Sequence, residues 1–214
     1  IIFCLWFFAF ITGLSPSVTR AVTMFSIFSF VKIINRRSSN LNNLSISFLL
    51  LILINPLWLF HLSFQLSYLA VLSIMLVQPK LSRYYRPQFY IDTLFWDIFT
   101  VSIAAQLGVL PLSIYYFHQF PGLFFITNLV VLPVISILLG GGILLVLLSA
   151  LNLSTDTFEQ AYNFLIKSLN GFINWVANQE VFVFKDIYYT LENTLTVYLL
   201  LSSLILLWYS FNYK

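Results

Sequence analysis

Long apolar runs separated by short polar breaks constrain this chain more than any other feature. Residues 57–77 and 123–151 are apolar almost throughout, and shorter runs recur along the chain. Hydrophobic residues make up 60% of the 214 residues and charged residues 8%, whereas soluble domains carry about 25% charged residues. An α-helix needs about 20 apolar residues to cross the hydrocarbon layer of a bilayer. The sequence therefore predicts an all-α, polytopic integral membrane helical bundle of roughly six to eight transmembrane segments plus one amphipathic helix.

Apolar runs and turn residues also predict where the helices lie. Asn55-Pro56 divides one long run into a helical hairpin. Pro133 and the glycines 140–142 interrupt another run, which we expect to be a broken helix, because such breaks occur where the backbone faces protein or water. We expect one membrane domain over residues 1–214, and a fragment, since its first apolar run is about half a span. The expected helical ranges are 17–34, 41–54, 57–77, 93–116, 123–151, 157–178 and 194–211.

Two basic loops predict the orientation in the membrane. Three lysines or arginines lie in residues 32–37, and three more lie in residues 80–86. The positive-inside rule places both loops in the cytoplasm. Both loops can lie on the same side only if the chain between them crosses the membrane twice. We therefore expect the short run 41–54 to be a span as well.

Polar residues recur every three or four positions in residues 157–178. They are Glu159, Asn163, Lys167, Asn170, Asn174 and Asn178. This spacing places them in one stripe along an amphipathic helix, and Asp156 with Glu159 resembles a capping box at its start. Two interpretations stay open. The helix lies at the membrane interface with its stripe in water, or asparagines such as Asn163 and Asn170 line a polar lumen.

Other polar residues fall within or at the ends of the apolar helices, where a buried charge or amide costs several kcal/mol unless it is paired or faces water. We expect Arg20 at the outer end of its helix, where it either snorkels or meets an anionic permeant. Gln106 lies among small residues near mid-membrane, where it bonds a neighbouring helix or faces a pore. His61 is expected near Arg20 at the outer mouth. The candidate pore-facing or substrate-facing residues are Arg20, Gln65, Gln106, Asn128, His118, Asn163 and Asn170.

Groups for catalysis are scarce. His61 and His118 are the only histidines, and neither has an aspartate, glutamate or cysteine at ligand spacing, so we expect no metal site and no cofactor. The sequence also lacks a glycine-rich phosphate loop and a serine nucleophile elbow, so we expect no enzymatic activity. With one cysteine, Cys4, no intrachain disulfide forms. A net charge of +3 does not by itself indicate nucleic-acid binding.

Four blocks combine polar residues with membrane context in one order along the chain. They are GLSPSVTRA at 13–21, NPLWLF at 55–60 running into FQLSYLA at 64–70, AAQLGVLPLS at 104–113 followed by YFHQF at 116–120, and NLVVLP at 128–133. In these blocks the sequence resembles the ComEC-type competence proteins, inner-membrane channels that admit single-stranded DNA during natural transformation. The likeness covers residues 11–178.

The resemblance implies a multi-pass domain of the bacterial inner membrane that passes single-stranded DNA into the cytoplasm. Its implied partners are single-stranded DNA, the lipid bilayer and other competence-machinery proteins, and homo-oligomerisation stays open. In full-length family members an oligonucleotide-binding-like domain and a metallo-β-lactamase-like domain flank this region, and we expect both to be absent here. Two alternatives remain, a membrane anchor or scaffold for a fused soluble metallo-hydrolase domain, or a transporter of another solute. A conduit requires polar side chains that share a face, whereas an anchor does not.

Overall fold

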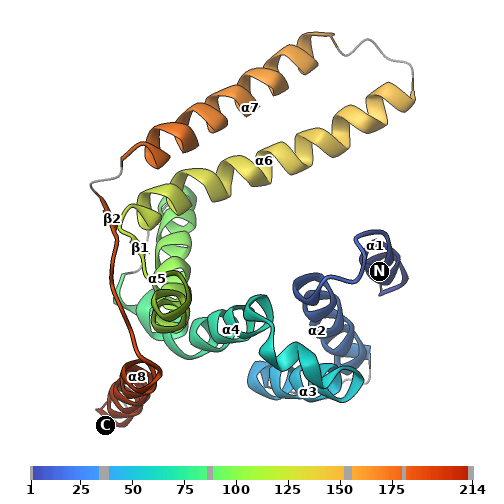
Figure 1. Cartoon of the computed structure of the whole chain (residues 1–214). Coiled ribbons are helices and arrows are strands. Elements are labelled where there is room, and N and C mark those ends of the chain that lie inside the picture. The colour runs from blue at the N-terminus through green and yellow to red at the C-terminus, as the bar shows by residue number, and fades with distance from the viewer. Residues whose placement is uncertain (1, 34–38, 86–88, 152–155, 180–181, 212–214) are drawn as a thin grey trace.

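The computed structural model describes residues 2–33, 39–85, 89–151, 156–179 and 182–211. Figure 1 shows these segments as helices joined by short connections, with one small pair of strands. The helices are α1 (Ile2–Ile11), α2 (Pro16–Ile33), α3 (Asn40–Ile54), η1 (Pro56–Phe60), α4 (Leu62–Leu81), η2 (Ser82–Tyr84), α5 (Tyr90–Phe117), α6 (Phe124–Ala150), α7 (Asp156–Ala177) and α8 (Leu191–Phe211). The strands are β1 (Phe120–Pro121) and β2 (Val183–Phe184).

Four helical segments in the described part of the chain are long and apolar enough to cross a membrane. They are Leu62–Tyr84, Tyr90–Phe117, Phe124–Ala150 and Leu191–Ser210. Three more helices, α1, α2 and α3, are apolar but shorter. The all-α, multi-pass class predicted from the sequence is therefore confirmed. The count of six to eight spans stays a prediction, because it requires shorter or more polar helices to cross as well.

The closest helix pair is α4 with α5, which run antiparallel from the short connection between them. A Cβ atom on Gly108 would lie 2.5 Å from the carbonyl oxygen of Leu69 and 2.5 Å from the Cβ of Ser73. Only glycine allows the two backbones to approach this closely. Ala104 on the same helix is fully buried. The small residues Ala104 and Gly108 in this part of α5 therefore serve close helix packing.

The first part of the bundle packs around an aromatic core between α2, α3 and α4. The ring of Tyr68 lies 4.6 Å from that of Phe64 and 5.0 Å from that of Phe48, measured between centroids. Leu44 and Leu51 of α3 are buried in the same core. The hairpin of α3 and α4 predicted from Asn55-Pro56 is thus present, with η1 at its turn.

The second part is an extended hairpin of α6 and α7 that projects away from the other helices (Figure 1). The expectation of a broken helix over residues 123–151 is wrong, because α6 is continuous through Pro133 and the three glycines. Proline removes one N–H from the ladder and crowds the carbonyl four residues earlier, but a transmembrane helix can continue through it. Gly141 and Gly142 have a different use, since a Cβ on Gly142 would lie 2.9 Å from the hydroxyl oxygen of Tyr162 on α7.

A two-residue ribbon of β1 and β2 ties two distant connections together, and the sequence did not predict it. Phe120 pairs with Phe184, and Pro121 pairs with Val183, in antiparallel register. The backbone N–H of Ile187 also donates to the carbonyl of His118 at 3.1 Å. The end of α5, the start of α6 and the segment that leads into α8 therefore lie together.

Helix ends differ most from the predictions at the two ends of α4. Residues 56–60 form η1 before α4 begins, because Asn55 Oδ1 accepts from the backbone N–H of Leu57 at 3.1 Å and starts a separate turn. At its other end α4 continues through Pro79 to Leu81, so Lys80 belongs to the helix and not to the basic loop. Three residues of the basic loops, Arg36, Arg37 and Arg86, lie outside the described residues, as does the side chain of Asp156 in the predicted capping box.

Candidate functional site

Arg20 lies in the α2 face that packs against α4. Its guanidinium carbon lies 5.8 Å from the centroid of the Tyr68 ring, within the range of a cation–π contact. Its Nη1 lies 3.9 Å from the sulfur of Met24. The Nε atom is buried, and among the described residues it has no hydrogen-bond partner. The positive charge is thus held by an aromatic ring and a thioether, both weak partners for a guanidinium.

A cavity of about 390 Å³ opens beside Arg20 between α2, α3 and α4. Arg20 and the buried Asn43 are polar residues in its wall, and Met24, Val71 and Met75 supply apolar surface. Arg20 therefore lies in the wall of an open, mostly apolar cavity whose lining also includes Asn43.

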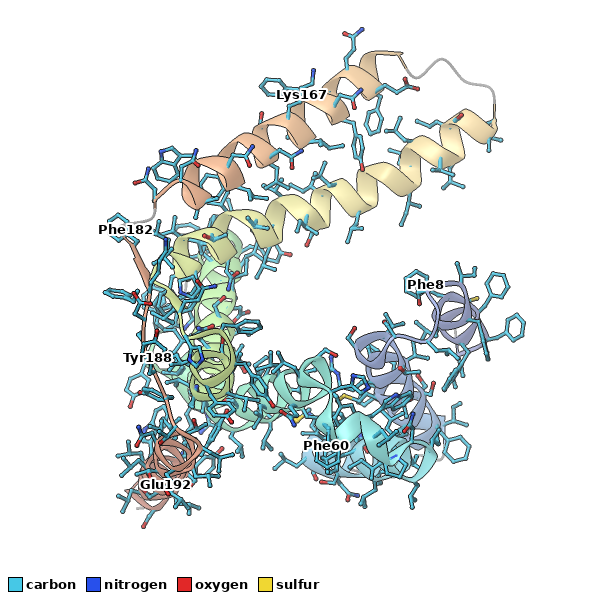
Figure 2. All side chains as sticks on the ribbon, viewed as in Figure 1. Phe8, Phe60, Lys167, Phe182, Tyr188 and Glu192 are labelled. Atoms are coloured by element: carbon cyan, nitrogen blue, oxygen red, sulfur yellow. The ribbon has the colours of Figure 1, made fainter. Side chains whose placement is uncertain are left out.

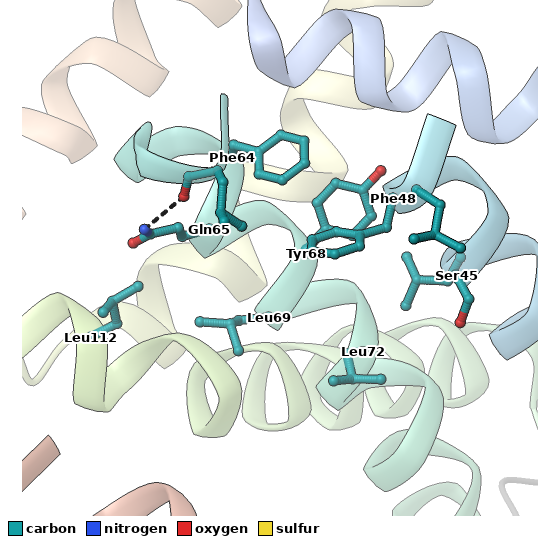
Figure 3. Close-up of a pocket in the computed structure, with 11 residues that line it drawn as sticks. Ser45, Phe48, Phe64, Gln65, Tyr68, Leu69, Leu72 and Leu112 are labelled. Carbon is teal, nitrogen blue, oxygen red and sulfur yellow. Dashed lines mark hydrogen bonds between the residues drawn. The ribbon is translucent and has the colours of Figure 1, made fainter. Parts of the chain in front are cut away.

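Tyr68, which contacts Arg20, lines a second cavity. Its hydroxyl lies 3.1 Å from the hydroxyl of Ser47, and both residues are buried. This cavity has a volume of about 710 Å³ and mostly apolar walls that include Phe48, Gln65 and Leu112 (Figure 3). The amide of Gln65 donates to the carbonyl of Leu59 at 2.8 Å. Tyr68 thus contacts Arg20 and shares the lining of the second cavity with Gln65.

The residues expected at one mouth of the bundle form two groups. Arg20 and Gln65 lie around Tyr68, whereas His118 and Asn128 lie at the connection from α5 to α6. His118 ends α5 in a left-handed conformation with φ 54°, and its ring lies 5.3 Å from that of Tyr188. The amide of Asn128 donates to the hydroxyl of Ser102 on α5 at 3.4 Å. Because α4 and α5 are antiparallel, His118 lies at the same end of this pair as Gln65, whereas Ser102, the partner of Asn128, is near the middle of α5.

The remaining candidates lie elsewhere. Gln106 is half-buried on α5. Asn163 and Asn170 are exposed on α7, and Figure 2 shows Lys167 of the same stripe pointing away from α6. The structure therefore does not bring the α7 asparagines to Arg20 within this chain.

Sequence reasoning missed a second cation, Lys80. Its Nζ lies 3.4 Å from the centroid of the Tyr209 ring and 5.3 Å from that of Trp208. The atom is buried without a hydrogen-bond partner in the described part of the chain. The Tyr209 hydroxyl donates to the carbonyl of Leu76 at 3.1 Å. Trp208 and Tyr209 are aromatic residues of the kind that lie at a membrane–water interface. Their sequence does not indicate that they contact α4.

The groups near Arg20 are a small set of polar side chains and aromatic rings in otherwise apolar walls. They are one guanidinium, the amides of Asn43 and Gln65, the paired hydroxyls of Ser47 and Tyr68, and aromatic rings. No group of three or more His, Cys, Asp or Glu side chains is placed to hold a metal ion among the residues that the structure describes.

Comparison with known proteins identifies the family. ComE operon protein 3 of Bacillus subtilis (strain 168) is 30% identical to the chain over 174 residues, which is 80% of this chain and 22% of that protein. The chain thus spans less than a quarter of the length of this curated relative. No solved structure matches the chain significantly. The profile of the family described as "Competence protein" matches residues 1–211, and the chain therefore belongs to the Competence protein family.

Proposed function

We propose that this chain is a conduit domain of the bacterial inner membrane that passes single-stranded DNA into the cytoplasm during DNA uptake. Membership of the Competence protein family supports a role in DNA uptake. The multi-pass helical fold supports a place within the membrane. The likeness to a protein of the ComE operon supports assembly with other competence proteins.

The observation that carries the conduit is the environment of Arg20. A DNA strand brings one negative charge per nucleotide, so a passage for it needs cations or neutral donors. The Arg20 guanidinium faces a cavity of about 390 Å³ together with Asn43, and its Nε has no hydrogen-bond partner among the described residues. A phosphate oxygen in this cavity is a better partner than the thioether and ring that hold the cation now. A few weak contacts suit a conduit, because a tightly bound strand would not leave.

The chain moves no substrate by itself in this proposal. It has no phosphate-binding loop for a nucleotide, so partner proteins supply the driving force. Strand entry takes place at the end of the bundle where Arg20 and Gln65 lie, on the side opposite to the basic loops. Enzymatic chemistry is assigned to none of its residues.

The test replaces Arg20 in the full-length protein in a naturally transformable host. We expect Arg20→Ala to lower transformation by about tenfold or more, because one charged interaction of ~1.4 kcal/mol corresponds to a factor of ten. Arg20→Lys is the matched control, since it keeps the charge and should retain most activity. Labelled DNA should accumulate outside the inner membrane in the alanine variant, at equal protein levels. Undiminished entry would return Arg20 to an interfacial anchor.

One observation favours a second function, the anchor or scaffold for a soluble metallo-hydrolase domain. Gln65 and Asn128 already bond groups within the bundle, as an anchor needs, and the α7 stripe does not converge with Arg20. Deleting the gene and tracking labelled DNA separates the two functions. A conduit predicts that DNA stalls outside the membrane, whereas an anchor predicts that intact DNA still enters. Normal DNA entry with loss of another solute would indicate a different transporter.

A further inference from the structure

α7 lies antiparallel along α6 over most of its length. Near its start, the Tyr162 hydroxyl donates to the carbonyl of Leu138 at 3.1 Å, and the ring packs on Gly141. Near its end, Val176 lines a cavity of about 270 Å³ together with Thr127 at the start of α6. The two helices are therefore paired from end to end, so their axes have the same inclination to the membrane.

The ribbon of β1 and β2 fixes on which side of the membrane this hairpin begins and ends. α6 starts directly after β1, and α8 starts after β2. Because the two strands are hydrogen-bonded, both helices start on the same side. α6 has 27 residues, most of them apolar, and is long enough to cross. The chain must then cross back before it reaches β2. α7 has 22 residues and is about 33 Å long at 1.5 Å per residue, so it is the segment that can do so.

A crossing helix with the α7 stripe cannot face lipid on all sides. Lys167 lies at the middle of α7, and its side chain is exposed. Figure 2 shows it pointing away from α6. The stripe residues on either side are exposed as well, and they are Glu159, Asn163, Asn170, Asn174 and Asn178. Charged and amide groups at this depth face water or a polar partner, because lipid leaves them without hydrogen bonds.

We propose that α7 crosses the bilayer beside α6 and that its asparagine and lysine stripe forms one wall of an aqueous passage for the DNA strand. The identity of the cargo rests on the proposed function above. The amide N–H groups of Asn163, Asn170 and Asn174 donate to phosphate or sugar oxygens without holding them tightly. Lys167 supplies a positive charge at mid-membrane, where a polyanion needs it most. The stripe faces away from the Arg20 cavity, so a neighbouring polypeptide supplies the opposite wall.

The first experiment measures depth. Phe164 and Trp175 are exposed by 68% and 55% and lie about three helical turns apart on one apolar side of α7. Single cysteines are placed at these positions by Phe164→Cys and Trp175→Cys, in the full-length protein from which Cys4 and its other cysteines have been removed. Each is labelled with a nitroxide in vesicles, and collisions with oxygen and a nickel chelate are compared. We expect the label at 164 near the midplane and the label at 175 near the surface. Equal, shallow depths would show an interfacial helix and overturn the proposal.

The second experiment measures water along the stripe. Asn163→Cys, Asn170→Cys and Asn174→Cys are treated with a membrane-impermeant maleimide, with Phe164→Cys as the matched lipid-facing control. We expect the stripe positions to react at least about tenfold faster than the control, since only a thiol in water forms the reactive thiolate. An inert stripe on a crossing helix would mean dry protein packing and overturn the passage.

A third readout separates this proposal from the proposed function. Modifying the cysteine of Asn170→Cys with a bulky maleimide, or introducing Lys167→Ala, should lower DNA uptake about tenfold at unchanged protein level. If the stripe reacts and the depths differ while uptake is unaffected, the passage stands and its assignment to DNA is wrong.

Discussion

At the scale of single residues, Tyr68 organises the polar centre of the bundle. Its ring contacts the Arg20 guanidinium, and its hydroxyl contacts Ser47. The hydroxyl of Ser47 also donates to the carbonyl of Leu44 at 2.8 Å, so it keeps a partner when Tyr68 changes. Ring and hydroxyl thus make separable contributions that two substitutions can distinguish.

We expect Tyr68→Phe to destabilise the bundle by about 0.5–1.5 kcal/mol, the value of one hydrogen bond. Tyr68→Leu should cost about 1–3 kcal/mol more, because it also removes the contact with Arg20 and the packing against two phenylalanine rings. Reversible unfolding of the detergent-solubilised protein measures both values. Equal losses in the two variants would mean that the ring does not support Arg20.

At the scale of helices, glycines have two different roles that the sequence does not distinguish. Gly108 lets α5 touch the backbone of α4. Gly140 on α6 has open space where a Cβ would lie. Both are interior helical positions, where alanine is favoured over glycine by about 1 kcal/mol when space allows. The surrounding structure therefore decides the sign of the same substitution.

Gly108→Ala should destabilise the protein by several kcal/mol, because a Cβ at 2.5 Å from the Leu69 oxygen forces the two helices apart. Gly140→Ala is the matched control, and we expect it to be neutral or to stabilise by up to about 1 kcal/mol. Thermal unfolding in detergent compares the two variants. A tolerated Gly108→Ala would contradict the close contact between α4 and α5.

At the scale of the whole molecule, the connections at the two ends of the α4–α5 pair indicate which end lies on which side of the membrane. The basic residues Lys80 and Arg83 lie where α4 ends, at the connection into α5. At the other end of the pair, the ribbon of β1 and β2 lies beside His118. The positive-inside rule then assigns the ribbon to the outer side of the membrane.

Intact cells carrying single cysteines test this orientation. Gln119→Cys and Asp186→Cys, both at exposed positions beside the ribbon, should react with a membrane-impermeant maleimide added outside. Arg83→Cys, also at an exposed position, is the control and should react only after the cells are opened. Labelling of position 83 in intact cells would invert the topology and move the Arg20 cavity to the cytoplasmic half.

Apolar length and scarce charge by themselves determined an all-α membrane protein, because hydrocarbon leaves the backbone few alternatives to a helix. The four sequence blocks likewise identified the family, and most helix ranges followed from turn residues. Tertiary structure alone decided which groups meet. Tyr68 of α4 contacts Arg20 of α2, and Lys80 contacts the ring of Tyr209 on α8. α6 is continuous, and its glycines 141 and 142 pack against Tyr162. Periodicity shows that one side of α7 is polar, but only the contacts of its other side with α6 show which way that polar side faces.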